Sequence, residues 1–154
     1  MQSPDDIKIV CVPPDRLPDV WHLVGGMLLR AQLASSTTAD DAIDKVVMGI
    51  RAIADGTAQL WMVTAENPPR VVSAWVTQIH QDEDGDRTVG IYVMSGMNAR
   101  KWMQEVSAAM AEFAKAEKCR AVVFWGRKAW GRLLPEFKRV DTRDDGAALF
   151  ERAV

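Results

Sequence analysis

The stretch Ile91–Arg127, IYVMSGMNARKWMQEVSAAMAEFAKAEKCRAVVFWGR, decides the fold of this chain. Its apolar start predicts a strand, and Ser95–Asn98 then forms a tight turn. After the turn, apolar side chains recur at the spacing of one helical face: Trp102, Val106, Met110 and Phe113. The run Ala121–Trp125 has no polar alternation, which predicts a strand buried on both faces and parallel to the strand before the helix.

The residues before and after this stretch predict a mixed α/β domain. A short strand is followed by two amphipathic helices, a three-stranded meander, the strand–helix–strand stretch, a short helix and a terminal strand or hairpin. The predicted strands before the long helix are Ile7–Val12, Gln59–Ala65, Arg70–His80 and Thr88–Met94. The short helix is Lys128–Leu134, and the turn Arg143–Gly146 separates the last edge strands.

Two local signals mark the first helices. Thr38, with Asp41 three residues later, resembles a capping arrangement, and Gly56 is placed to end the helix that Thr38 begins. Gly25 and Gly26 lie inside the helix before it, where each costs about 1 kcal/mol relative to Ala. We expect either a kink there or another backbone passing close by.

Length and charge restrict the class of protein. With 154 residues, the chain predicts a single domain over residues 1–154. A net charge of -2 without a basic block argues against nucleic-acid binding. No apolar run approaches the roughly 18 residues of a membrane span, and the start is acidic where a signal peptide is basic. Cys11 and Cys119 lie among apolar residues, so we expect two buried thiols in a reducing cytoplasm.

The order β-α-α-β-β-β-α-β-α-β resembles the GNAT (Gcn5-related N-acetyltransferase) fold over essentially the whole chain, an α/β (α+β) class with a mixed central sheet. More narrowly, the chain resembles small GNAT-like proteins of tailed bacteriophages. The residues that carry this second resemblance are scattered: Gly56, Gln59, Leu60, Trp61, Thr77, Gln78, Ile79, Trp102, Lys118, Cys119, Gly126, Arg127, Trp130, Leu134, Pro135, Phe137, Leu149 and Phe150.

The GNAT resemblance implies an acetyl-CoA site and no metal. In that family the fourth strand and the helix after it hold the cofactor, and the pantetheine arm lies between the splayed fourth and fifth strands. Unpaired N–H groups at a helix start also suit a pyrophosphate. The candidate cofactor-binding residues are Val93, Met94, Ser95, Gly96, Asn98, Ala99, Arg100 and Lys101.

The family's chemical signature is incomplete here. The usual turn is Arg/Gln-x-x-Gly-x-Gly/Ala, whereas this chain has Gly96 with Val93 in the leading position. No carboxylate lies between Thr88 and Met94, and the last helix has no tyrosine. Tyr92, the one phenol, and His80 are the candidate catalytic side chains.

Two functions remain open at this point. The missing motif favours a degenerate GNAT-like module with a virion structural or assembly role, made in the host cytoplasm and possibly carried in the virion. Its partners would be other virion proteins or a second copy of the chain, with Trp102 and Trp130 as interface anchors. The alternative is an acetyl-CoA-dependent N-acetyltransferase acting on an unknown amine.

Overall fold

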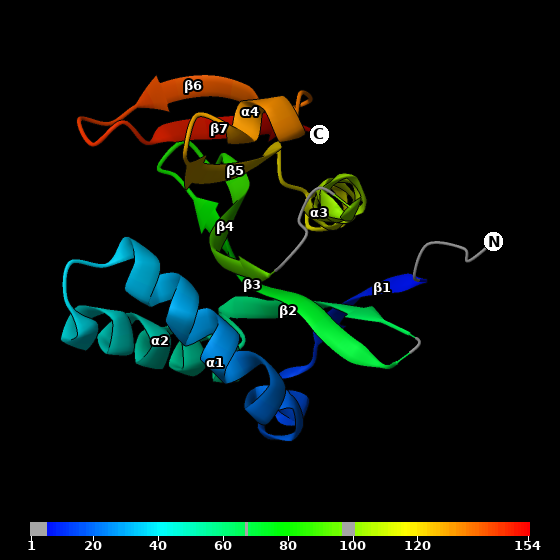
Figure 1. The fold of residues 1–154 in the computed structure, drawn as a ribbon. Coiled ribbons are helices and arrows are strands. Elements are labelled where there is room, and N and C mark those ends of the chain that lie inside the picture. Colours follow the sequence, from blue (N-terminus) through cyan, green and yellow to red (C-terminus); the bar gives the residue numbers. More distant parts are fainter. Residues whose placement is uncertain (1–5, 67, 97–100) are drawn as a thin grey trace. The chain divides into compact units, whose positions relative to one another are not determined.

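A computed structural model describes residues 6–66, 68–96 and 101–154. The helices and strands follow the predicted order (Figure 1). Their bounds are β1 Ile7–Val12, a 3-10 turn η1 Pro14–Arg16, α1 Leu17–Ser35, α2 Ala39–Ala54, β2 Ala58–Ala65, β3 Arg70–Gln81, β4 Arg87–Gly96, α3 Met103–Ala116, β5 Ala121–Gly126, α4 Trp130–Leu133, β6 Lys138–Thr142 and β7 Ala148–Ala153.

The strands of the described residues form a seven-stranded sheet in the order β1-β2-β3-β4-β5-β7-β6. β1 runs antiparallel to β2, β4 runs parallel to β5, and β7 runs antiparallel to both β5 and β6. The adjacent β2, β3 and β4 confirm the predicted meander. The parallel pairing of β4 with β5 confirms the strand–helix–strand prediction and the mixed α/β class.

The chain divides into two compact units by its internal contacts. The first contains the chain up to Thr77 with the end of β4, and the second contains Gln78–Tyr92 with the chain from α3 onward. The expectation of one domain over residues 1–154 stays a prediction. No helix in the described ranges is long and apolar enough to cross a membrane.

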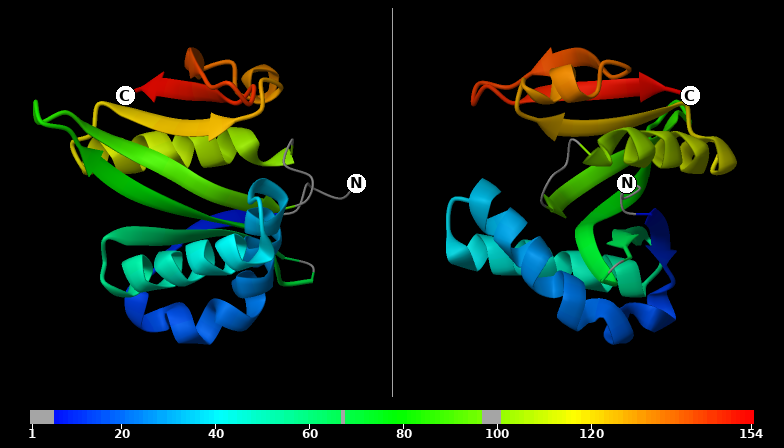
Figure 2. Two further views of the ribbon diagram at one scale, coloured as in Figure 1. Left: turned by 90° about the vertical axis from the view of Figure 1, so that its left-hand side faces the viewer. Right: turned by 45° about the vertical axis from the view of Figure 1, so that its right-hand side comes forward.

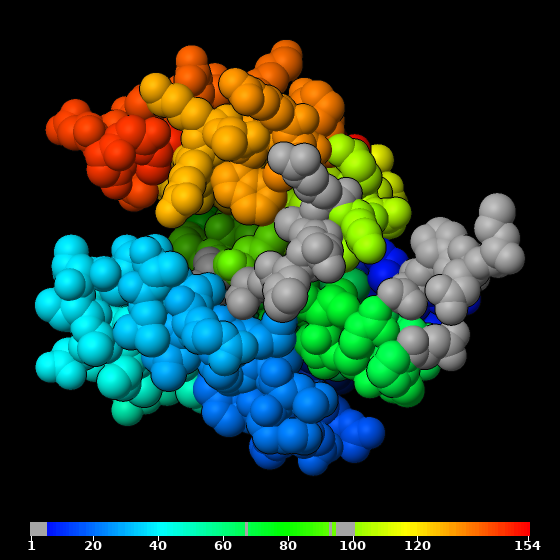
Figure 3. Space-filling model, viewed as in Figure 1, coloured from blue at the N-terminus to red at the C-terminus, as the bar shows by residue number. Residues whose placement is uncertain are grey.

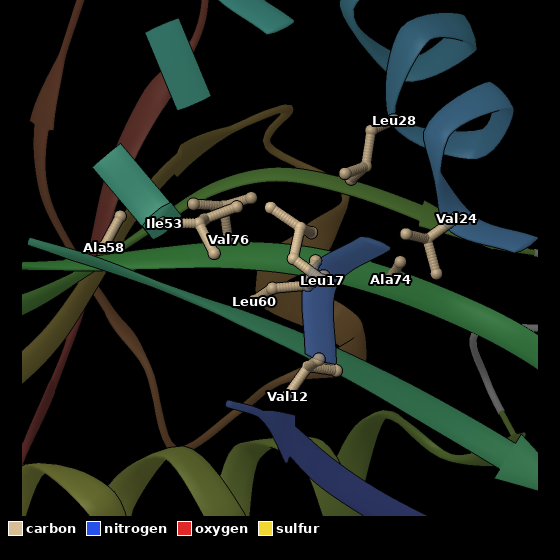
Figure 4. Close-up of a cluster of buried hydrophobic side chains, with 9 residues drawn as sticks. All are labelled: Val12, Leu17, Val24, Leu28, Ile53, Ala58, Leu60, Ala74 and Val76. Atoms are coloured by element: carbon tan, nitrogen blue, oxygen red, sulfur yellow. The ribbon is translucent and has the colours of Figure 1, made fainter. Parts of the chain in front are cut away.

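The first unit is built on β1 and β2 with the paired helices α1 and α2. The β1–β2 register runs from Ile7↔Ala65 to Val12↔Leu60. A buried apolar cluster joins these elements, because the inward faces of the helices and strands meet there (Figure 4): Val12, Leu17, Val24, Leu28, Ile53, Ala58, Leu60, Ala74 and Val76. The other sides of both helices are open to solvent, in blue and cyan (Figure 3).

The capping signals are confirmed, and the close neighbour of Gly25 is a side chain rather than a second backbone. Thr38 Oγ1 accepts a hydrogen bond from the Asp41 N–H at 3.0 Å, and Gly56 ends α2 with φ +80°. At Gly25, a Cβ atom would lie 2.6 Å from Cε2 of the Trp21 indole. The glycine is therefore needed because the side chain of its own helix folds over it, rather than because another backbone passes.

A buried polar chain anchors the tryptophans of the first unit. Trp61 Nε1 donates to Thr77 Oγ1 at 2.9 Å, and Thr77 Oγ1 donates to Gln59 Oε1 at 2.8 Å. The Trp61 and Trp75 rings stack with centroids 6.2 Å apart. The indole N–H thus keeps a partner inside the core, which a buried tryptophan requires.

The second unit places β5 between β4 and β7, with α3 packed against β5 (Figure 2). An aromatic cluster surrounds Phe124, with ring centroids 5.1 Å from both Phe137 and Phe150 and 6.3 Å from Trp130. These rings attach α4 and β7 to the same side of β5.

A polar network of the second unit joins α3 to β7. Ser107 Oγ on α3 donates to Glu136 Oε1 at 2.6 Å and accepts from Arg152 Nη1 at 2.7 Å. Ser107 is buried, so its hydroxyl satisfies two charged partners away from bulk water.

Three local predictions need correction. The α-helix of the central stretch begins at Met103, so Trp102, which the apolar spacing placed on the helical face, precedes it; Asn98 of the predicted turn lies outside the described residues. The strand β5 is expected from the sequence to be buried on both faces, but only Ala121 and Val122 are buried. Trp125, near the end of the strand, is 41% exposed. Cys119 is buried as expected, but Cys11 is an exposed residue.

Candidate functional site

The predicted cofactor turn is only partly described. Asn98, Ala99 and Arg100 lie outside the described residues, and Lys101 is exposed just before α3. Val93, Met94, Ser95 and Gly96 form the end of β4. The assignment of these residues to acetyl-CoA therefore stays a prediction.

The two candidate catalytic side chains contact each other in the second unit. His80, near the end of β3, has its Nε2 in hydrogen-bond contact with the Tyr92 hydroxyl on β4. The two rings meet edge to face, with centroids 5.7 Å apart and an interplanar angle of 73°. The sequence named each residue separately, and the structure brings them together.

Gly90 makes this contact possible. A Cβ atom at Gly90 would lie 3.2 Å from Cε2 of Tyr92 and 3.3 Å from both Cδ2 and Nε2 of His80. The two rings therefore occupy the space that any side chain at position 90 would take. A lone glycine inside a strand is the sequence signal of such a close approach, and our sequence reasoning missed it.

The environment of Tyr92 favours the protonated form of its phenol. Partial burial raises the pKa of the Tyr92 phenol above its ordinary value, because desolvation disfavours the phenolate. The hydroxyl is thus protonated at neutral pH, and it can donate to His80 Nε2 when that nitrogen carries no proton.

The pair lies on one identifiable face of the sheet. β4 pairs with β5 as Thr88↔Ala121, Val89↔Val122 and Gly90↔Val123. Paired residues share a face, and so do residues two apart on a strand. Gly90, Tyr92, Val123 and Trp125 therefore lie on one face, opposite to the face where Phe124 packs with α4 and β7.

The pairing of β4 with β5 covers fewer residues than the pairing of β5 with β7. The β4–β5 register given by the described residues ends at Gly90↔Val123, whereas β5 pairs with β7 from Ala121↔Ala153 to Gly126↔Ala148. Tyr92 thus continues β4 beyond the described pairs.

The guanidinium group of Arg143 lies over the ring of Trp125, which is on the same face as Tyr92. The Arg143 guanidinium carbon lies 4.6 Å from the centroid of its ring. Arg143 belongs to the β6–β7 turn, where its N–H donates to the Ala147 carbonyl at 2.8 Å. The sequence reasoning missed this contact, since it took the strand Ala121–Trp125 as buried on both faces.

The proposed interface anchors differ in exposure. Trp102 is 4% exposed and packs inside the chain, so it is not available to a partner. Trp130 is half-buried against Phe124. No group of three or more His, Cys, Asp or Glu side chains in the described part of the chain is placed to hold a metal ion.

Comparisons with known proteins identify the fold. No family model and no curated protein sequence matches the chain. Among solved structures, an agmatine N-acetyltransferase mutant in its apo form matches with a TM-score of 0.70 and 9% identity, over 97% of this chain and 100% of that chain. A GNAT-family acetyltransferase from Listeria monocytogenes matches with a TM-score of 0.60 and 9% identity, over 96% and 95%.

NAA60 from Arabidopsis thaliana in complex with acetyl-CoA matches with a TM-score of 0.61 and 10% identity, over 97% of this chain and 99% of that chain. At these identities the similarity establishes the fold alone. This chain therefore has the fold of the GNAT acetyltransferases, as the order of its elements predicted.

Proposed function

We propose that this chain transfers an acetyl group from acetyl-CoA to an amine, with Tyr92 and His80 as the pair that removes the amine proton. The observation that supports this most directly is the His80–Tyr92 contact on a GNAT fold. It supplies a proton acceptor where the sequence offers no carboxylate on β4.

The reaction requires a base. Acetyl-CoA supplies the acetyl group: the amine nitrogen bonds to the acetyl carbon, the carbon–sulfur bond breaks, and the amine gives up one proton. The coenzyme A thiolate leaves with the bonding electron pair and takes a proton from water. A positioned acid–base group typically contributes about 10²- to 10⁴-fold to such a step.

In this proposal the amine proton moves to Tyr92, and the phenol proton of Tyr92 moves on to His80. Tyr92 Oη accepts the amine proton while its own proton moves to His80 Nε2, so the phenol stays neutral and the imidazole becomes positively charged. His80 is exposed and gives the proton to water. Histidine suits this step because its side chain exchanges protons near neutral pH.

The residues that would hold acetyl-CoA are those at the end of β4 and at the turn. Gly96 and Ala99 are the small residues that the backbone approach needs, and Arg100 and Lys101 are the cations available to phosphates.

Two measurements test this proposal. Isothermal titration with millimolar acetyl-CoA reports cofactor binding, and release of the coenzyme A thiol with a panel of amines reports transfer. We expect Tyr92→Phe and His80→Gln to lower kcat by about 10²-fold or more with unchanged acetyl-CoA affinity. His22→Gln is the matched control, because His22 is the other histidine and lies on α1.

Absence of both heat and acetylated product would refute the function. Equal losses in the His22→Gln control would refute the assignment of the pair. The other sequence-based hypothesis, a virion structural role, draws no support from the comparisons, and the burial of Trp102 removes one of its two proposed anchors. Co-purification with virions at a fixed copy number would revive it.

A further inference from the structure

An exposed tryptophan on the same face as Tyr92 has a cation bound to its ring. Trp125 keeps 41% of its surface exposed, although Arg143 lies over the indole. An indole face attracts a cation through the ring quadrupole, and the attraction is about 0.5–1 kcal/mol at an exposed site. The contact is thus weak enough for another cation to replace it.

The surroundings of Arg143 favour cations over anions. In the β6–β7 turn, Arg143 is followed by Asp144 and Asp145, and Asp141 precedes it on β6; all three carboxylates belong to exposed residues. Arg143 Nη2 lies 3.5 Å from Asp145 Oδ2. A carboxylate is therefore already placed beside the position that the guanidinium occupies, and it would remain there if the guanidinium moved away.

The position of Trp125 relates it to the acid–base pair. In the β4–β5 register, Gly90 pairs with Val123, and Tyr92 and Trp125 each lie two residues further along their strands. Both side chains therefore share one face and one end of the paired strands. A molecule that presents one group to Tyr92 can therefore extend along this face toward Trp125.

We propose that Trp125 and the acidic β6–β7 turn bind a second cationic group of the acceptor, so that the substrate is a diamine or a guanidino-amine. This inference rests on the proposed acetyl transfer. One amine reaches Tyr92, and the second cation takes the place of Arg143 on the Trp125 ring beside Asp145. Arg143 thus acts as an internal competitor that fills the cation position in the free protein.

The binding test uses the whole chain without acetyl-CoA. The indole N–H signals of ¹⁵N-labelled protein are followed by NMR, and Trp125→Phe identifies the signal of Trp125. We expect 1,4-diaminobutane to shift this signal saturably. Butylamine, which has one charge, should need an about two- to five-fold higher concentration for half-saturation, as expected from the loss of one exposed cation–π contact.

A charge-matched pair of variants tests the role of Arg143. Arg143→Gln should lower the half-saturating concentration of 1,4-diaminobutane by about two- to five-fold, because the internal competitor is gone. Arg139→Gln removes the same charge from an exposed position on β6 of the same hairpin, and it should not lower that concentration.

The outcomes separate this inference from the proposed function. A Trp125 signal that does not move, equal concentrations for the two amines, or equal effects of the two arginine variants would overturn the cation site, even if monoamines are acetylated. A selective response of Trp125 in a chain that shows no acetyl transfer would support the cation site and refute the transferase. In active protein, Trp125→Leu should raise KM for the diamine by a larger factor than KM for butylamine.

Discussion

Replacing Gly90 by alanine tests whether the His80–Tyr92 contact is needed. The added Cβ atom would lie 3.2–3.3 Å from atoms of both rings, which is tighter than an ordinary van der Waals contact. At least one ring must move by a few tenths of an ångström. Because the new methyl group presses on both rings, including His80 Nε2, we expect the hydrogen bond between them to be disrupted.

The expected effect on stability is small. Glycine to alanine gains about 0.4–1 kcal/mol through the unfolded state, and loss of one hydrogen bond costs about 0.5–1.5 kcal/mol. His80 is exposed and Tyr92 is 44% exposed, so both rings can shift without opening the core. The net change should stay within about 1 kcal/mol, or about 2–4 °C in Tm for a chain of this size.

The expected effect on activity is large. If the pair removes the amine proton, its separation should lower kcat by about 10²-fold or more while the affinity for acetyl-CoA stays the same. The assay combines steady-state kinetics with ¹⁵N NMR of the His80 imidazole, which reports whether Nε2 still accepts a hydrogen bond.

Gly49→Ala is the matched control. Position 49 on α2 has no atom within 4 Å of the added Cβ, so the same chemical change meets open space there. It should raise Tm slightly and leave kcat unchanged, since alanine favours a helix by about 1 kcal/mol. Full activity of the Gly90→Ala variant, with unchanged imidazole signals, would refute the reasoning.

Three further predictions follow from single contacts. Ser107→Ala should lower the free energy of unfolding by about 1–3 kcal/mol, measured by urea denaturation, because Glu136 and Arg152 each lose a partner; an unchanged midpoint would contradict this. Since burial raises the pKa of Tyr92, the folded chain holds its proton longer than the unfolded chain, so stability should fall as pH rises above about 10, and Tyr92→Phe should reduce that slope. Cys11, an exposed residue whose thiol pKa is raised by desolvation, should react with iodoacetamide in the native protein, but more slowly than free cysteine at pH 8; mass spectrometry of the alkylated chain checks this.

The sequence alone determined the elements whose signals are local. The strand Ile7–Val12, the cap at Thr38 and the strand–helix–strand order around α3 all follow from apolar period and cap chemistry, and the structure confirms them. Such signals depend on neighbours within a few residues. The order of these elements also sufficed to predict the fold.

Only the tertiary structure decided which side chains meet. His80 and Tyr92 are twelve residues apart and touch because two strands are paired and Gly90 leaves the space. The contact of Trp125 with Arg143, and the burial of Trp102, depend equally on segments that come together after folding. The apolar spacing in the sequence places Trp102 on the same helical face as Val106. Whether the Trp102 side chain is exposed depends on the packing of other elements against it.

The central stretch Ile91–Arg127 shows both what the sequence determines and what the tertiary structure determines. Its apolar pattern fixed a strand, a helix and a parallel strand, since backbone hydrogen bonding and face burial leave few other arrangements. Its side-chain contacts depend on β3 and on the β6–β7 turn, which bring His80 and Arg143 to that strand pair from outside the stretch. Local periodicity carries no information about such partners, because a side-chain contact is set by strand register and by the space that one glycine leaves.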